Sequence, residues 1–213
     1  MNPLLKLILI AAAVFVIGAS LLAAGCGLVY YRTGHQSHPV WIAGSPNLVD
    51  EGVIDMWRGV PVRYNGVPYT QSWGKHYADD GYYYGQKWQC VEFMKRYYHD
   101  RMKHAFPDVM GHAADFFDAN TQSGTLNVKR GLWQYVNGHE EAPQVDDILV
   151  WTSNGYGHVA IITRVEDGMV QWIQQNVRSG TRGETVVSVC DGKFFVGEYG
   201  MLGAPAGWLR AKK

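Results

Sequence analysis

The sequence lacks the features that define several classes of protein. Its 19 basic and 19 acidic side chains balance, so it has no excess of positive charge for binding nucleic acid. It has only 3 cysteines, without a C-x-x-C pair, which excludes a disulfide framework and a zinc site built on cysteines. It also has no internal repeat and no low-complexity tract. We therefore expect one catalytic-sized domain with no nucleic-acid partner, no metal and no other cofactor.

One long apolar run stands at the N-terminus. No charged side chain occurs from Leu7 to Tyr31, which is long enough for a helix to cross a bilayer. The stretch that ends at Cys26, Leu-Ala-Ala-Gly-Cys, also resembles the lipobox of bacterial lipoproteins, in which the cysteine is lipidated. A transmembrane anchor and a lipoprotein signal both remain open. In either case residues 1–31 are a targeting segment that attaches the chain to a membrane.

The rest of the chain divides into a tether and one domain. Residues 32–52 are rich in Gly, Ser, Pro and His and are expected to form the tether, and residues 53–213 the domain. We expect this domain in the cell envelope, on the outer side of the cytoplasmic membrane. Lys6 and Arg32 flank the apolar run with one charge each and do not fix its orientation.

Hydrophobic periodicity predicts an α+β fold. Residues 53–80 are broken by prolines and by Asn65-Gly66, and indicate an irregular strap. Apolar side chains at helical spacing predict a helix over residues 91–105, and a second helical stretch is expected over 112–119. After Pro143 the pattern changes to β-rich runs. These are residues 146–151, 158–165, 169–176 and 184–190.

Cys90 directly precedes the predicted helix. Unpaired backbone N–H groups at a helix start favour an anion, and Lys87 adds positive charge nearby, so we expect a lowered thiol pKa and a nucleophilic Cys90. A free cysteine is more often a small buried hydrophobe. A catalytic role therefore needs a base.

His158 is the best candidate for that base. It follows a glycine-rich loop and opens an apolar strand, which can fix an imidazole beside a cleft. A three-residue loop, residues 166–168, would place His158 opposite Asn176, with Gln174 diagonally adjacent on the same face. A two-residue loop at 167–168 would turn Gln174 to the other face. Only the first register gives His158 an amide oxygen to bind.

The segments GQKWQCVEFMKRYY, GHVAIITRV and WIQQNV occur in this order. They resemble the CHAP family of cysteine, histidine-dependent amidohydrolases/peptidases, and especially the amidase domain of bifunctional glutathionylspermidine synthetase/amidase. The resemblance covers roughly residues 60–210. It implies a papain-like α+β fold, with Cys90 as nucleophile on the helix and His158 as base on the sheet.

One position departs from the family pattern. Gln174 stands where these proteins usually carry a glutamate that orients the histidine, and Asn176 matches their asparagine. A neutral amide can hold the tautomer of the imidazole but stabilises the imidazolium less than a carboxylate does. Either Gln174 or Asn176 is expected to orient His158. The backbone N–H of Cys90 and the side chain of Gln89 are the candidate oxyanion donors.

Three functions fit these residues. The first is an envelope cysteine amidase or peptidase that forms a thioester and cleaves stem peptides of peptidoglycan. The second is a glutathionylspermidine-type amidase that cleaves a small amide. The third is a CHAP-like binding module without catalysis, which the intact pair of Cys90 and His158 argues against.

Overall fold

A computed structural model describes residues 52–66 and 70–212 of the chain. The apolar run of residues 7–31, Cys26 and all but the last residue of the predicted tether lie outside these ranges. Within them, no helix has the length and the apolar character needed to cross a bilayer.

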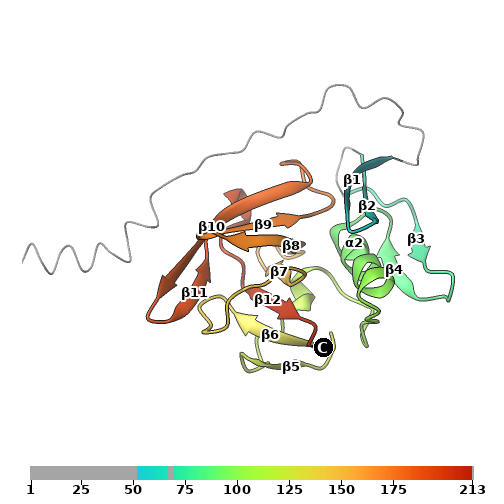
Figure 1. The fold of residues 1–213 in the computed structure, drawn as a ribbon. Coiled ribbons are helices and arrows are strands. Elements are labelled where there is room, and N and C mark those ends of the chain that lie inside the picture. The colour runs from blue at the N-terminus through green and yellow to red at the C-terminus, as the bar shows by residue number, and fades with distance from the viewer. Residues whose placement is uncertain (1–51, 67–69, 213) are drawn as a thin grey trace, which may run out of the picture. The chain divides into compact units, whose positions relative to one another are not determined.

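An antiparallel sheet of eight strands carries the domain, in the order β11-β10-β9-β8-β7-β12-β6-β5 (Figure 1). Its strands are β5 (Thr125–Asn127), β6 (Leu132–Val136), β7 (Ile148–Trp151), β8 (His158–Glu166), β9 (Met169–Ile173), β10 (Arg182–Cys190), β11 (Lys193–Val196) and β12 (Gly207–Arg210). With the helix described below, this sheet confirms the predicted α+β, papain-like class. The four predicted strands correspond to β7, β8, β9 and β10.

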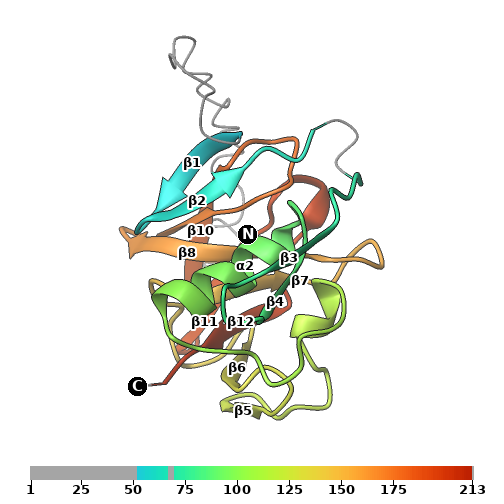
Figure 2. The same ribbon diagram turned by 90° about the vertical axis from the view of Figure 1, so that its right-hand side faces the viewer.

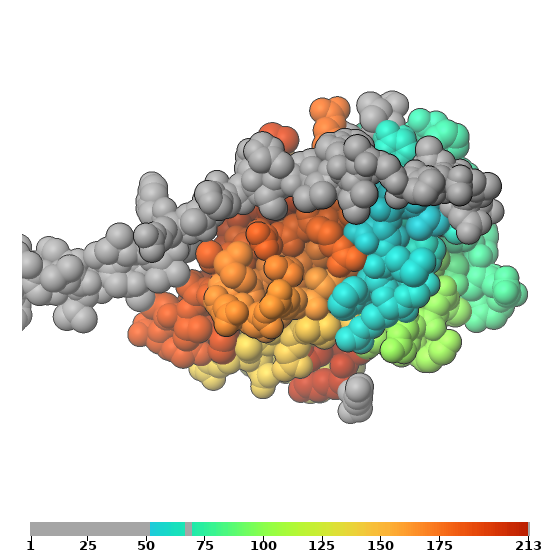
Figure 3. Space-filling model, turned by 45° about the horizontal axis from the view of Figure 1, so that its top comes forward, coloured from blue at the N-terminus to red at the C-terminus, as the bar shows by residue number. Residues whose placement is uncertain are grey.

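Residues 53–80 contain strands of two hairpins, so the prediction of an irregular strap was wrong for most of this segment. The hairpins pair β1 (Val53–Trp57) with β2 (Val60–Arg63) and β3 (Lys75–Tyr77) with β4 (Tyr83–Gln86). The turn of the first is Arg58-Gly59, both at positive φ, which matches the twist of two adjoining strands. Asp55 of β1 pairs with Arg182 of β10 at 2.7 Å. Figure 3 shows the cyan surface of this hairpin beside the orange surface of the later strands.

The predicted helix exists but is shorter than its apolar pattern. Helix α2 spans Cys90–Arg96 and continues as the π-helical turn η2 (Tyr97–Arg101). Lys103 adopts a left-handed conformation, with φ of 57°, and so ends the helix before Pro107.

The second predicted helix, over residues 112–119, is only the 3₁₀ turn η3 (Ala114–Phe116), and a further 3₁₀ turn is η4 (Gly200–Leu202). The carboxylates of Asp115 and Asp118 accept hydrogen bonds from nearby backbone N–H groups, of His112 and Asn120. Such local bonds favour turns over helix.

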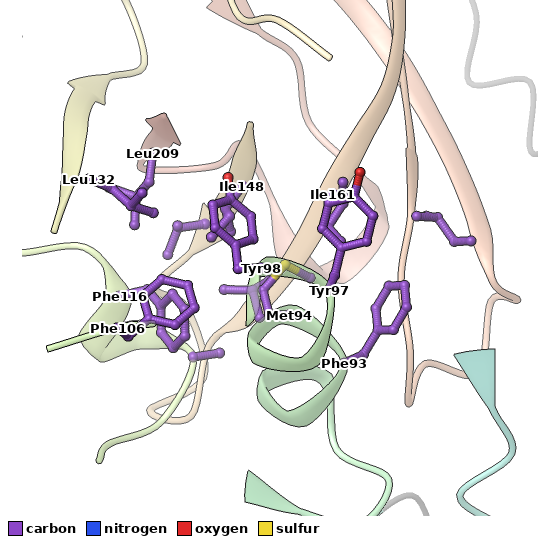
Figure 4. Close-up of a cluster of buried hydrophobic side chains, with 14 of the residues drawn as sticks. Phe93, Met94, Tyr97, Tyr98, Phe106, Phe116, Leu132, Ile148, Ile161 and Leu209 are labelled. Carbon is purple, nitrogen blue, oxygen red and sulfur yellow. The ribbon is translucent and has the colours of Figure 1, made fainter. Parts of the chain in front are cut away.

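Apolar side chains cover both faces of the sheet. Figure 2 shows α2 lying across one face. Figure 4 shows the side chains buried between the helix and that face: Phe93, Met94, Tyr97 and Tyr98 pack with Ile148, Ile161 and Leu209. The other face buries Trp151, Trp172 and Trp208. Full burial of a large apolar side chain contributes about 1.5–3 kcal/mol, so this packing fixes α2 against the sheet.

Candidate active site

Cys90 is the first residue of α2. Gln89 precedes the helix in an extended conformation, and its side chain makes no capping hydrogen bond. The Cys90 side chain is half-buried against the apolar cluster between helix and sheet. The backbone N–H groups of Cys90, Val91 and Val159 favour its thiolate and so act to lower the pKa of Cys90. Because Val159 directly follows His158, the start of α2 and the start of β8 meet at this thiol.

The electrostatics of Cys90 differ from the prediction. Burial raises the pKa of the Cys90 thiol to about 11, and the three backbone N–H groups offset this effect only in part. The predicted lowering of the pKa was therefore wrong. Desolvation of a thiolate outweighs the helix start here. Lys87 lies with its Nζ 5.6 Å from the centre of the Trp88 ring and is not among the groups that shift this pKa.

His158 is the first residue of β8 and is 4 % exposed. Gly157 leads into it with φ of 70°, and a Cβ at that position would lie 2.4 Å from the carbonyl oxygen of Trp151. Only glycine fits there, so the glycine-rich loop noted in the sequence serves to place the imidazole. Burial lowers the pKa of His158 to about 4. At neutral pH the side chain of Cys90 is therefore a thiol and that of His158 a neutral imidazole.

Gln174 holds the imidazole of His158. The Oε1 atom of Gln174 lies 3.1 Å from His158 Nε2 and also accepts a hydrogen bond of 3.0 Å from Trp172 Nε1. Gln174 Nε2 donates to the carbonyl oxygen of Gly180 at 3.1 Å. Since that carbonyl can only accept, and the indole N–H can only donate, the amide has one orientation. His158 therefore carries its proton on Nε2 and keeps the lone pair on Nδ1.

A bulge produces this contact. The hairpin turns at Asp167-Gly168, with Glu166 opposite Met169, so of the two loop lengths considered the structure has the two-residue loop. The register shifts between Ile162 and Arg164, and beyond the shift Ile162 pairs with Trp172. That pairing continues the register of the three-residue loop. The extra residue in β8 thus returns Gln174 to the face of His158.

Asn176 takes a different place from the one predicted for an orienter. Its Nδ2 atom donates to Gln89 Oε1 at 2.5 Å, and its Oδ1 atom accepts from Asn65 Nδ2 at 2.9 Å. Gln89 Nε2 in turn donates to the carbonyl oxygen of Gln71 at 2.8 Å. Of the two candidates left open, Gln174 contacts His158, and Asn176 positions the side chain beside Cys90. The oxyanion role of Gln89 stays a prediction.

Sequence reasoning missed a buried link between the helix and the end of β9. Glu92 is fully buried two residues after Cys90 and accepts a 2.8 Å hydrogen bond from Gln175 Nε2. Gln175 Nε2 also donates to the carbonyl oxygen of Gln89 at 3.0 Å. The only signal in the sequence was Glu92 itself, a carboxylate inside an otherwise apolar stripe.

Comparison with known proteins agrees with this arrangement. Residues 80–176 match the CHAP domain, which confirms the predicted resemblance. The bifunctional glutathionylspermidine synthetase/amidase of Escherichia coli K12 is 36% identical over 108 residues, as is that of Shigella flexneri, and the match covers 48% of this chain. The trypanothione synthetase of Crithidia fasciculata is 32% identical over 108 residues, or 49% of this chain. The matched region spans 17% of the length of each of these relatives.

Proposed function

We propose that the chain is a cysteine-dependent amidohydrolase, with Cys90 as nucleophile and His158 as base. The observation that carries the proposal is the contact between His158 Nε2 and Gln174 Oε1, which leaves Nδ1 unprotonated. The match to the CHAP domain and the relatives named as amidases support the reaction class.

The reaction is proton transfer followed by acyl transfer. The Cys90 thiol gives its proton to His158 Nδ1 as the sulfur attacks the amide carbonyl carbon, and the C–S bond forms. The carbonyl electrons move to oxygen. As the tetrahedral intermediate collapses, the C–N bond breaks and the imidazolium returns the proton to the leaving amine. Water, deprotonated by His158 Nδ1, then attacks the thioester carbon, the C–S bond breaks to release the carboxylic acid, and the imidazolium returns its proton to the Cys90 sulfur.

Gln174 acts on the proton balance of this reaction. Its amide oxygen accepts from Nε2–H in both charge states of the ring, so His158 keeps one tautomer throughout. The imidazolium is unfavourable because His158 is buried and has no carboxylate partner. In the resting enzyme His158 and the Cys90 thiol are therefore both neutral. Developing charge on the substrate oxygen needs donors, for which the N–H of Cys90 and the side chain of Gln89 are the candidates.

Two substrates are candidates. A stem peptide of peptidoglycan follows from the apolar run of residues 7–31, because an anchored domain outside the cell would face that polymer. An amide of the glutathionylspermidine type follows from the similarity of the chain to two glutathionylspermidine synthetase/amidases.

Digestion of both substrates distinguishes them. Purified peptidoglycan and glutathionylspermidine are incubated with the full-length chain, and the products are identified by mass spectrometry. New amino and carboxyl termini in stem peptides support the first substrate, and free spermidine supports the second. Cys90→Ala is the control, and products that form equally with this variant would contradict the proposed chemistry.

We infer further that the N-terminal run attaches the chain to the cytoplasmic membrane with the domain outside. The full-length protein should sediment with membranes and resist high salt, which removes only electrostatically bound proteins. Cys26→Ser should accumulate as uncleaved precursor if the chain is a lipoprotein, and behave as wild type if the run is a transmembrane anchor. A reporter that is active only outside the cytoplasm, fused after residue 213, should be active. An inactive reporter would contradict the outer location of the domain.

A further inference from the structure

A pocket lies at the C-terminal end of α2, whereas Cys90 is the first residue of that helix. The volume of the pocket is about 700 Å³, and β2, the β3–β4 hairpin, the end of α2 and η2 line it. Neither Cys90 nor His158 is among the described residues of its wall. Figure 2 shows the elements that surround it, with β2 above α2 and β3 and β4 beside the helix.

Basic side chains dominate this wall. It includes Arg58, Arg63, Arg96 and Arg101, together with His76 and His99.

Three carboxylates, Asp79, Asp80 and Asp100, line the same pocket. Asp80 and Asp100 both bind His99, at 3.0 and 2.9 Å. Among the arginines, Arg58 pairs with Asp146 at 2.6 Å. Arg63 stacks its guanidinium 4.7 Å from the centre of the Trp88 ring.

Arg96 has one hydrogen-bonding group without a partner. The residue is 5 % exposed, its Nε donates to Glu92 Oε1 at 2.6 Å, and its Nη2 lies 3.4 Å from Glu92 Oε2. Its Nη1 atom is buried and makes no hydrogen bond in the described structure. A buried unsatisfied donor is costly, and more so when it is charged.

Glu92 cannot supply the missing acceptor. Its Oε1 atom also accepts from His76 Nδ1 at 2.8 Å, and its Oε2 atom accepts from Gln175 at 2.8 Å. The carboxylate is thus already shared among three side chains. Because Arg96 lines the pocket, a group bound there is the acceptor that we assign to Nη1.

We propose that this pocket binds a small oxyanion, a carboxylate or phosphate group, on Arg96 Nη1, with Arg63 as the second cation. A planar guanidinium matches the oxygens of both groups, and charge-assisted hydrogen bonds of this kind are about twice as strong as neutral ones. The site is distinct from the reaction centre: Arg96 lies six positions after Cys90, about 9 Å along the helix.

Calorimetric titration of the full-length chain tests this site. Sodium phosphate and sodium acetate serve as separate probes at fixed ionic strength, and one of them should bind saturably with one equivalent. The two arms distinguish a phosphate ligand from a carboxylate ligand. Arg63→Gln and Arg96→Gln should each weaken binding at least tenfold. Arg164→Gln, an exposed arginine outside the pocket wall, should bind as wild type.

Folding of the variants is checked by thermal unfolding, because Arg96→Gln leaves the buried Glu92 without its guanidinium. If that variant does not fold, Arg63→Gln decides, since it keeps the Arg96–Glu92 pair. The proposal is overturned if neither anion binds wild type saturably, if Arg63→Gln binds as wild type, or if Arg164→Gln weakens binding equally.

Discussion

His158 Nε2 lies 3.1 Å from Gln174 Oε1, although the turn that joins their strands sets a register in which they would face opposite sides of the sheet. The bulge between Ile162 and Arg164 corrects that register. The contact assigns the tautomer of the base, and it does so with a neutral amide where a carboxylate would make the histidine more basic.

Gln174→Glu should therefore raise the pKa of His158 from about 4 toward its ordinary value, because an opposite charge at this distance stabilises the imidazolium. Hydrolysis should be preserved or increased. Stability should fall by about 1–3 kcal/mol, since the new carboxylate faces the carbonyl oxygen of Gly180. NMR titration of the His158 ring measures the shift. Gln144→Glu, at an exposed position, is the charge-matched control, and a shift equal in both variants would contradict the assignment.

Stability should depend on pH through His158. Its folded pKa of about 4 lies below the ordinary value of 6.5, so between these values the unfolded chain binds more protons and acid favours unfolding. This residue should remove about 3 kcal/mol of stability as the pH falls through that window. Burial raises the pKa of Asp147 to about 6, and this carboxyl therefore acts in the opposite direction. Its effect cancels when wild type is compared with a variant that lacks only His158.

Denaturant unfolding of wild type and His158→Gln at several pH values isolates this effect. As the pH falls from 6.5 to 4, wild type should lose about 3 kcal/mol of unfolding free energy relative to the variant, which has no titrating group at this position. Parallel pH profiles would show that His158 is not buried as a neutral ring.

Alkylation of Cys90 should report a neutral thiol. Because burial raises its pKa to about 11, the rate of reaction with iodoacetamide should keep rising with pH through the neutral range. Peptide mass spectrometry separates this rate from that of Cys190, which serves as the internal control. A fast rate that is already constant near pH 6 would reveal a thiolate–imidazolium pair and refute the neutral resting state.

Asn176→Gly should lower kcat without moving the pKa of His158. The side chain of Asn176 bonds Gln89 and Asn65 and has no described bond to the imidazole; loss of its hydrogen bond to Gln89 alone is worth about 1 kcal/mol, or roughly fivefold in rate. Glycine is chosen because Asn176 has φ of 64°. Asp191→Gly, at another positive φ, is the control. A changed histidine pKa would mean that Asn176 orients the ring after all.

Much of this fold could be predicted because its signals are local. The start of α2 at Cys90 follows from a helical stripe, and the start of β8 at His158 follows from a glycine-rich loop before an apolar run. The class of the fold, the strand that begins at His158 and the strand that ends directly before Gln174 depend on these signals alone.

The remaining features depend on tertiary contacts. The bulge in β8 leaves no mark in the alternation of side chains, so the sequence could not show that a two-residue loop occurs together with the register that brings Gln174 to His158. The pKa of Cys90 depends on its burial in the folded chain, and the β1–β2 hairpin contacts β10 through the ion pair of Asp55 with Arg182. Neither the burial of Cys90 nor this ion pair can be inferred from the spacing of residues along the chain.

Trapping of the acyl-enzyme tests the central claim most directly. Full-length protein is mixed with the substrate found by digestion, quenched with acid within the first turnover, and analysed by peptide mass spectrometry. The proposed mechanism predicts a thioester adduct on the peptide that contains Cys90, absent from Cys90→Ala, and formed far more slowly in His158→Ala. Hydrolysis by Cys90→Ala, or an adduct on a different residue, would contradict it.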